Sequence, residues 1–444
     1  MRHIITRALK TDLVKISFSN GMANVLKLLA AVIGNRIVAL YLGPVGIALL
    51  GQFLNVGLIA TALATLGIGN GITKYAAEYR ADDEKRARLI STGLFLGSIA
   101  TGIVSLVLWR GRFYFAVSVF KEPSFASVFS LFGASMMFFT LQAFSVALLA
   151  GNKEFKKAIG INIISSFLGL IISVILIRRF LLLGAIWGVM VSQVIVSLVS
   201  LGWMVKSSWW SWRACVSGID SVIIKNLGKF SLMTFTNTFA TAFVQLRIRS
   251  HIMDSISVQE AGYWQGIVKL SDVYVMFIIA TLGIYYLPRL SEIRDNDELR
   301  REVRNVFLFV MPLTVVSSAV IYWGRDLVVS WLFADSFAPM KELFLFQLTG
   351  NIFRVGGWLL AYVLIARAMT MMFVVSELCC GGLLYGATLL MVNKYGAIGA
   401  TYSYAVTHVL YFVAQVILFR IISRRQGTQA ADEDILGQIP EQGI

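Results

Sequence analysis

Long apolar stretches recur along the whole chain, and this recurrence restricts the possible fold more than any other feature of the sequence. A helix needs about 20 consecutive, mainly apolar residues to cross a bilayer. The composition agrees, because 57% of the residues are hydrophobic and only 14% are charged. We therefore expect an all-α polytopic membrane protein rather than a soluble domain. Hydropathy predicts about twelve transmembrane helices, at 18–41, 45–71, 89–109, 125–149, 158–177, 183–205, 229–250, 263–287, 305–323, 341–366, 371–392 and 398–420.

The formal net charge of +15 also has a membrane explanation. In a soluble chain it would suggest a nucleic-acid partner, but in a membrane protein Lys and Arg gather in the cytoplasmic connections. If the N-terminus is cytoplasmic, roughly 25 of the 39 basic residues lie in the inner connections and about 10 in the outer ones. We therefore expect both termini to be cytoplasmic and no nucleic-acid partner.

The two halves of the chain carry matching segments. The sequence ATLGI at 64–68 recurs at 280–284, and the charged residues that follow it recur with the same spacing. A third match joins GAI at 184–186 to GAI at 396–398. The near-constant offset and the even number of predicted spans in each half indicate parallel repeats, related by a pseudo-twofold axis along the membrane normal.

These repeats define the domains that we expect. Each repeat forms one six-helix bundle, and the Trp-rich, basic segment between them suits a linker at headgroup level. The polar end of the chain is typical of a disordered segment. The predicted parts are an N-terminal bundle over 1–205, a cytoplasmic interfacial linker over 206–228, a C-terminal bundle over 229–422 and a disordered cytoplasmic tail over 423–444.

Polar residues follow one face of several predicted spans. Such stripes have two explanations: hydrogen bonds that join neighbouring helices, or the lining of a hydrated cavity. Several stripes together favour the cavity. The members are Asn20, Asn24 and Lys27; Thr234, Asn237, Thr238, Thr241 and Gln245; Gln265, Lys269 and Asp272; Gln347, Asn351, Arg354 and Trp358; and Tyr404, His408, Tyr411 and Gln415.

Charged residues within the spans give a sharper indication, because a charge at bilayer depth is costly. The basic members are Lys27, Arg36, Lys269 and Arg354, and they outnumber the acidic members, Asp272 and Glu377. One explanation is structural ion pairing, for example between Lys269 and Asp272, which are three residues apart. Arg36 can also snorkel to the outer interface, near which Arg247 and Arg249 lie as well. The excess of positive charge fits a cargo that carries an anion such as a phosphate.

The remaining polar candidates keep two readings each. Asp272 and Glu377 are either proton- or sodium-coupling groups or simple counter-charges. His408 is either a helix residue that forms a hydrogen bond or a proton relay. Trp358 and other aromatic residues near span ends either stack on sugar rings or anchor the chain at the interface.

Motifs of enzymes and of bound cofactors are missing from the sequence. It contains no Walker loop, and no spacing of residues typical of a nucleophilic triad or a metal site. The three cysteines, Cys215, Cys379 and Cys380, suggest no disulfide framework. We therefore expect a non-enzymatic protein without metal or cofactor.

Several short motifs together resemble those of a known family. The chain is similar to the Wzx-type flippases of lipid-linked oligosaccharides, of the O-antigen and enterobacterial common antigen kind, in the multidrug/oligosaccharidyl-lipid/polysaccharide exporter superfamily. The resemblance covers about residues 10–425. The motifs that carry it are LGPVG at 42–46, NGITKY at 70–75, GYWQG at 262–266, SDVY at 271–274, LPRLS at 287–291 and RVG at 354–356.

This resemblance implies a V-shaped pair of bundles in a bacterial inner membrane. The cargo would be an undecaprenyl-diphosphate-linked oligosaccharide, moved from the cytoplasmic to the periplasmic leaflet by alternating access. Partners would be membrane lipids, with the glycan polymerase and the chain-length regulator as candidate protein partners. The diphosphate would meet Lys27, Arg36, Lys269 and Arg354 in a cationic cavity, and the stripes add Asn24, Gln265, Asn351 and Trp358 to the substrate-binding residues that we expect.

Two other functions stay open on the residues alone. A cation-coupled exporter of small molecules or drugs from the same superfamily has the same architecture, although its cavity would be expected to favour acidic and aromatic linings. A glycan polymerase or ligase needs a platform for catalysis outside the membrane, and no predicted outer connection exceeds about twenty residues.

Overall fold

The chain is helical throughout the part that the computed structural model describes, which is residues 2–293, 295–367 and 369–437. Within these ranges the side chains of 2–25, 229–230, 232–237, 277, 279–285, 288 and 424–437 are not described. The described residues form α-helices and short 3₁₀ helices and no strand. This confirms the all-α class. The helices pack into two compact units, which are described separately.

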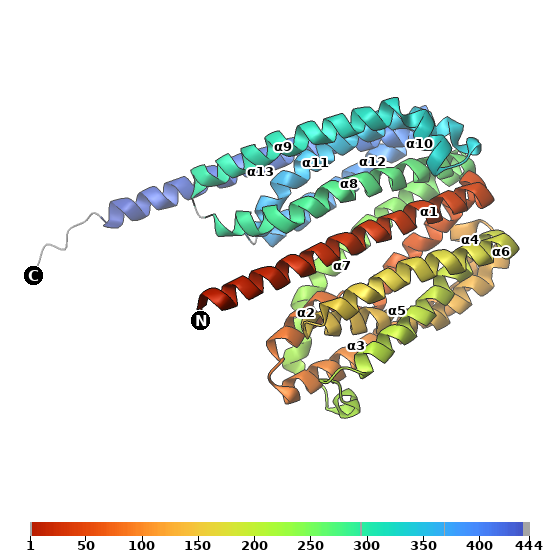
Figure 1. The fold of residues 1–444 in the computed structure, drawn as a ribbon. Coiled ribbons are helices and arrows are strands. Elements are labelled where there is room, and N and C mark those ends of the chain that lie inside the picture. Colours follow the sequence, from red (N-terminus) through yellow and green to blue (C-terminus); the bar gives the residue numbers. More distant parts are fainter. Residues whose placement is uncertain (1, 294, 368, 438–444) are drawn as a thin grey trace, which may run out of the picture. The chain divides into compact units, whose positions relative to one another are not determined.

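Unit 1 comprises Met1–Ser250 and Ser330–Phe337. Within it, α1 packs along α6, and α5 packs against α3 and α6 (Figure 1). One core cluster gathers around Ile72, Leu89 and Leu148. The elements are α1 (Arg2–Ala64), α2 (Gly69–Glu78), α3 (Asp83–Arg110), α4 (Arg112–Phe120), η1 (Pro123–Phe125), α5 (Ala126–Gly151), α6 (Phe155–Val205), η2 (Trp212–Val216) and α7 (Ser221–Ser255).

Unit 2 comprises His251–Val329 and Ala338–Ile444. Its central helix is α11, which packs most extensively against α13 and also against α8 and α9. Its core gathers around Tyr286, Leu299 and Leu359. The elements are α8 (Val258–Glu292), α9 (Asn296–Trp323), α10 (Arg325–Leu332), η3 (Asp335–Leu343), α11 (Phe344–Ala366), α12 (Thr370–Tyr395) and α13 (Ile398–Gly437).

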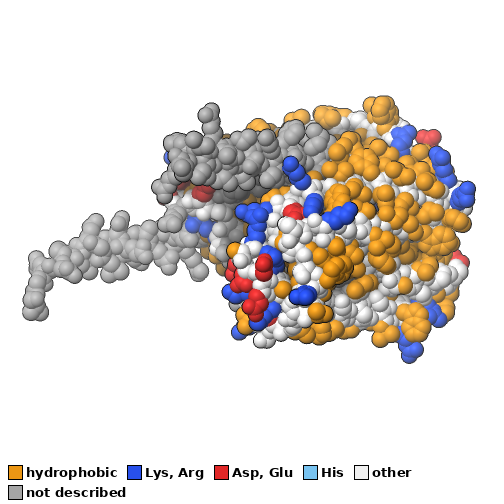
Figure 2. All heavy atoms as spheres, turned by 60° about the horizontal axis from the view of Figure 1, so that its bottom comes forward, with side chains coloured by type: hydrophobic (Ala, Val, Ile, Leu, Met, Phe, Trp, Pro, Cys, Tyr) orange, Lys and Arg blue, Asp and Glu red, His pale blue; other side chains and the backbone are white. Residues whose placement is uncertain are grey.

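Eight helical segments of the described residues are long and apolar enough to cross a membrane. Two of them are divided by a break in the backbone, at Gly43 in α1 (φ 62°) and at Leu181 in α6 (φ 50°). Both breaks fall where hydropathy predicts the end of one span and the start of the next. Figure 2 shows hydrophobic side chains over much of the visible surface, with charged side chains gathered on both sides of this apolar region. The chain is thus a multi-pass membrane protein, while the twelve-span, two-bundle layout stays a prediction.

Similar sharp corners occur in both units. Leu181 (φ 50°, ψ −124°) divides α6, and Gly396 (φ 70°, ψ −155°) separates α12 from α13. Three residues after each corner stands a glycine, Gly184 or Gly399, on which a Cβ would overlap with a carbonyl oxygen of the preceding helical segment. By this packing Gly184 corresponds to Gly399, three residues beyond Gly396, to which the sequence match joins it.

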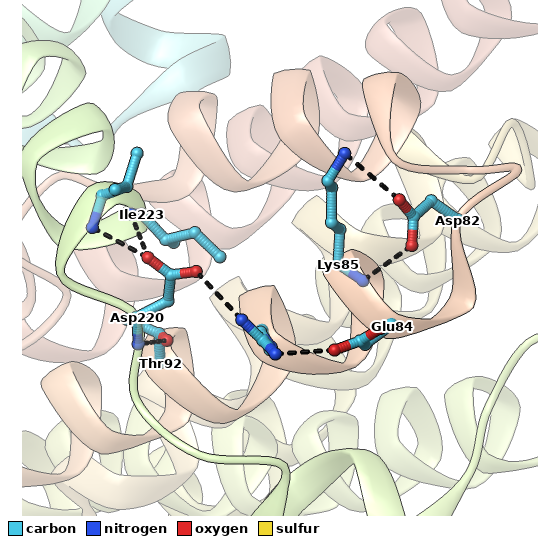
Figure 3. Close-up of polar contacts among 8 residues, drawn as sticks. Asp82, Glu84, Lys85, Thr92, Asp220 and Ile223 are labelled. Carbon is cyan, nitrogen blue, oxygen red and sulfur yellow. Dashed lines mark hydrogen bonds and ion pairs between the residues drawn. The ribbon is translucent and has the colours of Figure 1, made fainter.

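The start of α3 and the end of α6 are tied together in unit 1. The Arg86 guanidinium forms an ion pair with Asp83 and donates a hydrogen bond to the carbonyl oxygen of Trp209, at 3.4 Å. The Asp82 carboxylate caps α3 by accepting from the backbone N–H of Lys85 at 3.0 Å (Figure 3). These contacts hold the segment after α6 against α3.

The same tie recurs in unit 2. The Arg300 guanidinium, at the start of α9, forms an ion pair with Asp297 (3.2 Å) and donates to the carbonyl oxygen of Ser423 (2.9 Å). Asp295 caps α9 as Asp82 caps α3. Each unit thus has an arginine, Arg86 or Arg300, that joins its third predicted span to the end of its sixth. These two sets of contacts are called the arginine ties below.

Two acidic residues fix the segment that follows α6. Glu154 accepts hydrogen bonds from the Ser207 hydroxyl (2.8 Å) and the Trp209 indole (2.9 Å) and pairs with Lys157 (2.6 Å). Burial raises the pKa of the Glu154 carboxyl, but these hydrogen bonds together outweigh burial, so that the pKa lies below its ordinary value. The segment that follows α6 is therefore held within unit 1 by partly buried polar contacts.

Asp220 is the second of these acidic residues. Its backbone N–H donates to the Thr92 hydroxyl (3.1 Å), and its carboxylate accepts from the N–H groups of Val222 (2.8 Å) and Ile223 (3.3 Å), which caps α7. The carboxylate also lies 3.8 Å from Arg88 (Figure 3). The role of 206–228 as an interfacial linker stays a prediction. Such a linker would need exposed aromatic side chains, and Trp212 is 65% exposed.

At the other end of the chain, α13 continues to Gly437. The disordered cytoplasmic tail over 423–444 stays a prediction. The stretch contains strong helix formers such as Ala430, Ala431 and Leu436, whose propensity competes with its polarity. Residues 438–444 lie outside the described residues.

Candidate functional site

Arg354 is the centre of a polar cluster inside unit 2. Its side chain is 20% exposed, and one terminal nitrogen donates to the Asp272 carboxylate (3.2 Å) and to the Tyr404 hydroxyl oxygen (3.1 Å). The guanidinium carbon lies 4.5 Å from the centre of the Trp358 ring, in a cation–π contact. Helices α8, α11 and α13 thus each contribute a group to hold this cation.

Tyr404 is itself held firmly. Its hydroxyl donates to the side-chain oxygen of Asn351 at 2.7 Å, and Asn351 is completely buried. Its ring lies over Gly350, where a Cβ would overlap with the ring carbons. On the other side, the His408 ring lies 4.1 Å away, centre to centre. The tyrosine is therefore fixed by α11 and by its own helix.

A second tyrosine repeats this packing two turns further along α13. The Tyr411 ring lies over Gly357, as the Tyr404 ring lies over Gly350. The Tyr411 hydroxyl donates to the Glu377 carboxylate of α12 at 2.6 Å. His408 lies between the tyrosines, and its Nδ1 is 2.8 Å from the carbonyl oxygen of Tyr404. Because a carbonyl can only accept, Nδ1 carries the proton, which agrees with the hydrogen-bonding reading of His408.

Further polar atoms along α11 and α8 have unused hydrogen-bonding capacity. Gln347 is 1% exposed and Ser271 is 1% exposed. The Gln347 side-chain oxygen and the Ser271 hydroxyl have no hydrogen-bond partner within the described part of the chain. Buried polar atoms of this kind are the ones that ordered water usually satisfies. The interior of unit 2 is therefore polar around Arg354.

The predicted site residues separate into two groups. Four of them, Asp272, Asn351, Arg354 and Trp358, meet in the cluster. Glu377 accepts a hydrogen bond from Tyr411, whose ring is next to His408, and His408 is next to Tyr404. Gln265 is buried and Lys269 half-buried on α8 of the same unit, and both make contacts of their own. The ion pair expected as one reading of the intramembrane cations occurs, but Asp272 pairs with Arg354.

The other candidates belong to unit 1. Lys27 and Arg36 are exposed on α1, and neither forms an ion pair with any carboxylate that the structure describes. The side chain of Asn24 lies outside the described residues. Their part in substrate binding stays a prediction.

The sequence interpretation missed two polar groups that the structure makes prominent. Tyr404 was seen only as part of a stripe, although its seven-residue spacing from Tyr411 matches that of Gly350 from Gly357. Arg249 was expected near the outer interface, but it is 0% exposed and donates to the Gln52 side-chain oxygen at 3.0 Å. A polar residue such as Gln52 inside an apolar span was the available signal.

Solved structures of other transporters share this fold. An inward-facing multidrug resistance MATE family transporter of the MOP superfamily superposes with a TM-score of 0.80 at 13% identity, covering 93% of this chain and 99% of that one. A MOP superfamily transporter from Pyrococcus furiosus, described as having a binding pocket of reverse polarity, superposes with a TM-score of 0.68 at 14% identity, covering 92% and 95%. At these identities the likeness concerns the fold alone.

Curated relatives are more similar in sequence. The lipid III flippase of Escherichia coli (strain K12) is 26% identical over 418 residues, which cover 93% of this chain and 100% of that protein. A putative O-antigen transporter of Shigella flexneri is 26% identical over 365 residues, which cover 78% and 83%. The model of the polysaccharide biosynthesis protein family matches residues 13–294, more than half of the chain, and the chain belongs to that family.

Proposed function

We propose that this protein is a flippase, and not an enzyme, for a lipid-linked oligosaccharide. The cargo would be an undecaprenyl-diphosphate-linked oligosaccharide, moved from the cytoplasmic to the periplasmic leaflet of the bacterial inner membrane. The family membership and the relatives named as flippase and O-antigen transporter support this class. Both termini would then be cytoplasmic, and the chain would cross the membrane about twelve times by the span length of a helix.

The observation that carries the proposal is the setting of Arg354. A guanidinium inside a membrane-spanning helix is costly, and such residues usually mark a functional site. Its planar fork suits a phosphate better than an ammonium does. Its second terminal nitrogen and its Nε are in no hydrogen bond with any described residue, so these two donors suit a bidentate contact with a phosphate. We assign Arg354 as the residue that meets the diphosphate.

The further substrate contacts extend this proposal. Lys27, Arg36 and Lys269 would add positive charge along the route of the diphosphate, in a cationic cavity that opens by alternating access. Asn24, Gln265 and Asn351 would contribute hydrogen bonds, and Trp358 a stacking surface for a sugar. Asp272 and Glu377 are the carboxylates available to couple transport to a cation.

The test is complementation of a strain that lacks its own flippase for the same cargo. Losing one partner of a buried charged contact costs about 2–5 kcal/mol, so Arg354→Ala should abolish surface glycan at an unchanged protein level. Arg354→Lys should restore little, because an ammonium cannot form the bidentate contact. Lys394→Ala, which removes an exposed cation from the same unit, is the matched control and should complement fully.

The alternative is a cation-coupled exporter of small molecules or drugs, which the fold of the multidrug transporters would also accommodate. It predicts that expression raises drug resistance in a strain without its main efflux pumps. Absence of surface glycan with the unmodified protein, together with raised drug resistance, would replace the flippase proposal with this one. Normal surface glycan with Arg354→Ala would overturn the assignment of Arg354 to the diphosphate.

A further inference from the structure

The contacts around Arg354 differ in how firmly they are held. Asn351 is completely buried, and it holds Tyr404 through a hydrogen bond of 2.7 Å. Trp358 lies against the face of the guanidinium. The Asp272 side chain, in contrast, is 46% exposed and uses a single oxygen at 3.2 Å. Of the groups that hold Arg354, Asp272 is the one that can leave without disturbing the packing.

A phosphate would make the stronger contact with the same cation. Asp272 shares one terminal nitrogen with Tyr404, whereas a phosphate oxygen pair can engage two nitrogens of the guanidinium at once. Without cargo, a buried cation that lost its carboxylate would pay a desolvation cost. When no cargo is bound, a carboxylate paired with the Arg354 guanidinium avoids this cost. It leaves when an anion that binds the guanidinium more strongly arrives.

We propose that the Asp272 carboxylate occupies Arg354 in place of the phosphate of the cargo when the protein is empty. The cargo displaces Asp272 from Arg354, and Asp272 returns to expel the cargo at the end of transport. No covalent bond is made or broken. One anion replaces another on the Arg354 guanidinium, which Tyr404 and Trp358 keep in place. This inference rests on the proposed function, because it assumes that Arg354 meets a phosphate. It adds a reason for the cargo to leave.

The exchange predicts that removal of the carboxylate tightens binding. If Asp272 occupies the cation about 90% of the time, the apparent dissociation constant of an anion is about tenfold higher than that of the free site. Inorganic pyrophosphate is a suitable probe, because it carries the diphosphate without lipid or sugar. Titration calorimetry on the purified full-length protein should give an apparent Kd about tenfold lower for Asp272→Asn than for the unmodified protein.

Matched variants separate this exchange from general electrostatics. Asp326→Asn removes a carboxylate that pairs with Lys341 at 2.5 Å in the same unit, and it should leave the Kd for pyrophosphate unchanged. Asp272→Glu keeps a competing carboxylate and should stay close to the unmodified protein. If Asp272→Asn does not fold, Asp272→Ser removes the carboxylate as well and should bind pyrophosphate as tightly as predicted for the asparagine variant.

Transport should respond in the opposite sense to binding. In proteoliposomes that contain the lipid-linked cargo, Asp272→Asn should lower both the half-saturating concentration and the maximal rate, because the cargo is no longer expelled. Unchanged or weaker pyrophosphate binding by Asp272→Asn, with binding lost in Arg354→Ala, would overturn the exchange and leave the flippase proposal standing. Pyrophosphate binding that survives Arg354→Ala would overturn both the exchange and the assignment of Arg354 to the diphosphate.

Discussion

The site in unit 2 depends on the absence of a side chain at two positions of α11. Tyr404 and Tyr411 approach the backbone of α11 closely because residues 350 and 357 are glycines. Tyr404 then reaches Arg354 and Asn351 with its hydroxyl. Each glycine lowers the stability of a helix by about 1 kcal/mol relative to alanine. Glycine is needed here because the tyrosine rings leave no room for a Cβ.

A methyl group at residue 350 should therefore disturb the site. In Gly350→Ala the new Cβ would overlap with the Tyr404 ring, and overpacking of this kind typically costs about 1–3 kcal/mol. We expect a lower midpoint of thermal unfolding in detergent and reduced complementation. Gly382→Ala on α12, where a Cβ meets no atom within 4 Å, should be neutral or stabilising. Equal midpoints for the two variants would contradict the packing argument.

Much of this site could be predicted from the sequence. The stripe of Asn351, Arg354 and Trp358 is visible as a helical period, and Asp272 is visible because a charge inside an apolar run is rare. The pairing of Asp272 with Arg354 rather than with Lys269 could not be predicted, because it depends on how α8 packs against α11. The role of Tyr404 depends in the same way on the contact between α11 and α13.

At the scale of elements, identical sequences adopt different structures in the two units. In unit 1, ATLGI at 64–68 ends α1, and Leu66 (φ 51°) and Gly67 (φ 62°) have left-handed backbone angles. In unit 2, the copy at 280–284 lies within the uninterrupted helix α8. Local propensity is the same for both copies, so the neighbouring helices decide the outcome. The repeat was thus predictable from the sequence, whereas the break in one copy was not.

The arginine ties give a prediction at this scale. Arg300→Ala removes the hydrogen bond to the Ser423 carbonyl oxygen, and one such bond contributes about 0.5–1.5 kcal/mol. We expect amide hydrogen exchange near Arg420–Ser423 to accelerate by up to about tenfold, as measured by mass spectrometry. Arg301→Ala, which removes an exposed neighbour on α9, should leave exchange there unchanged. An equal acceleration in both variants would argue against the tie.

Glu154 gives a pH-dependent prediction for the segment after α6. Its folded-state pKa lies below the ordinary 4.5, so the folded state binds fewer protons. The stabilisation is complete above that ordinary pKa and is lost as the pH falls below it. The difference in unfolding midpoint between the unmodified protein and Glu154→Gln should therefore shrink below about pH 4.5. Glu122→Gln, at an exposed position, is the control; a difference that is constant with pH would contradict this role.

At the scale of the whole molecule, the repeats predict on which side of the membrane matching segments lie. The arginine ties and the corners at Leu181 and Gly396 occur in the same order in both units. If the repeats are parallel and the N-terminus is cytoplasmic, both ties would lie on the cytoplasmic side and both corners on the periplasmic side. Inverted repeats would put the two ties on opposite sides of the membrane. The distribution of Lys and Arg predicts the first arrangement.

Cysteine labelling distinguishes these arrangements. In a variant without the native cysteines, Arg179→Cys and Lys394→Cys, exposed beside the two corners, should react with an impermeant maleimide in intact spheroplasts. Glu84→Cys and Glu298→Cys, near the two ties, should react only after lysis. Because each pair occupies matching positions of the two repeats, the pairs control for one another. Labelling of Arg179→Cys together with Glu298→Cys in intact spheroplasts would mean inverted repeats.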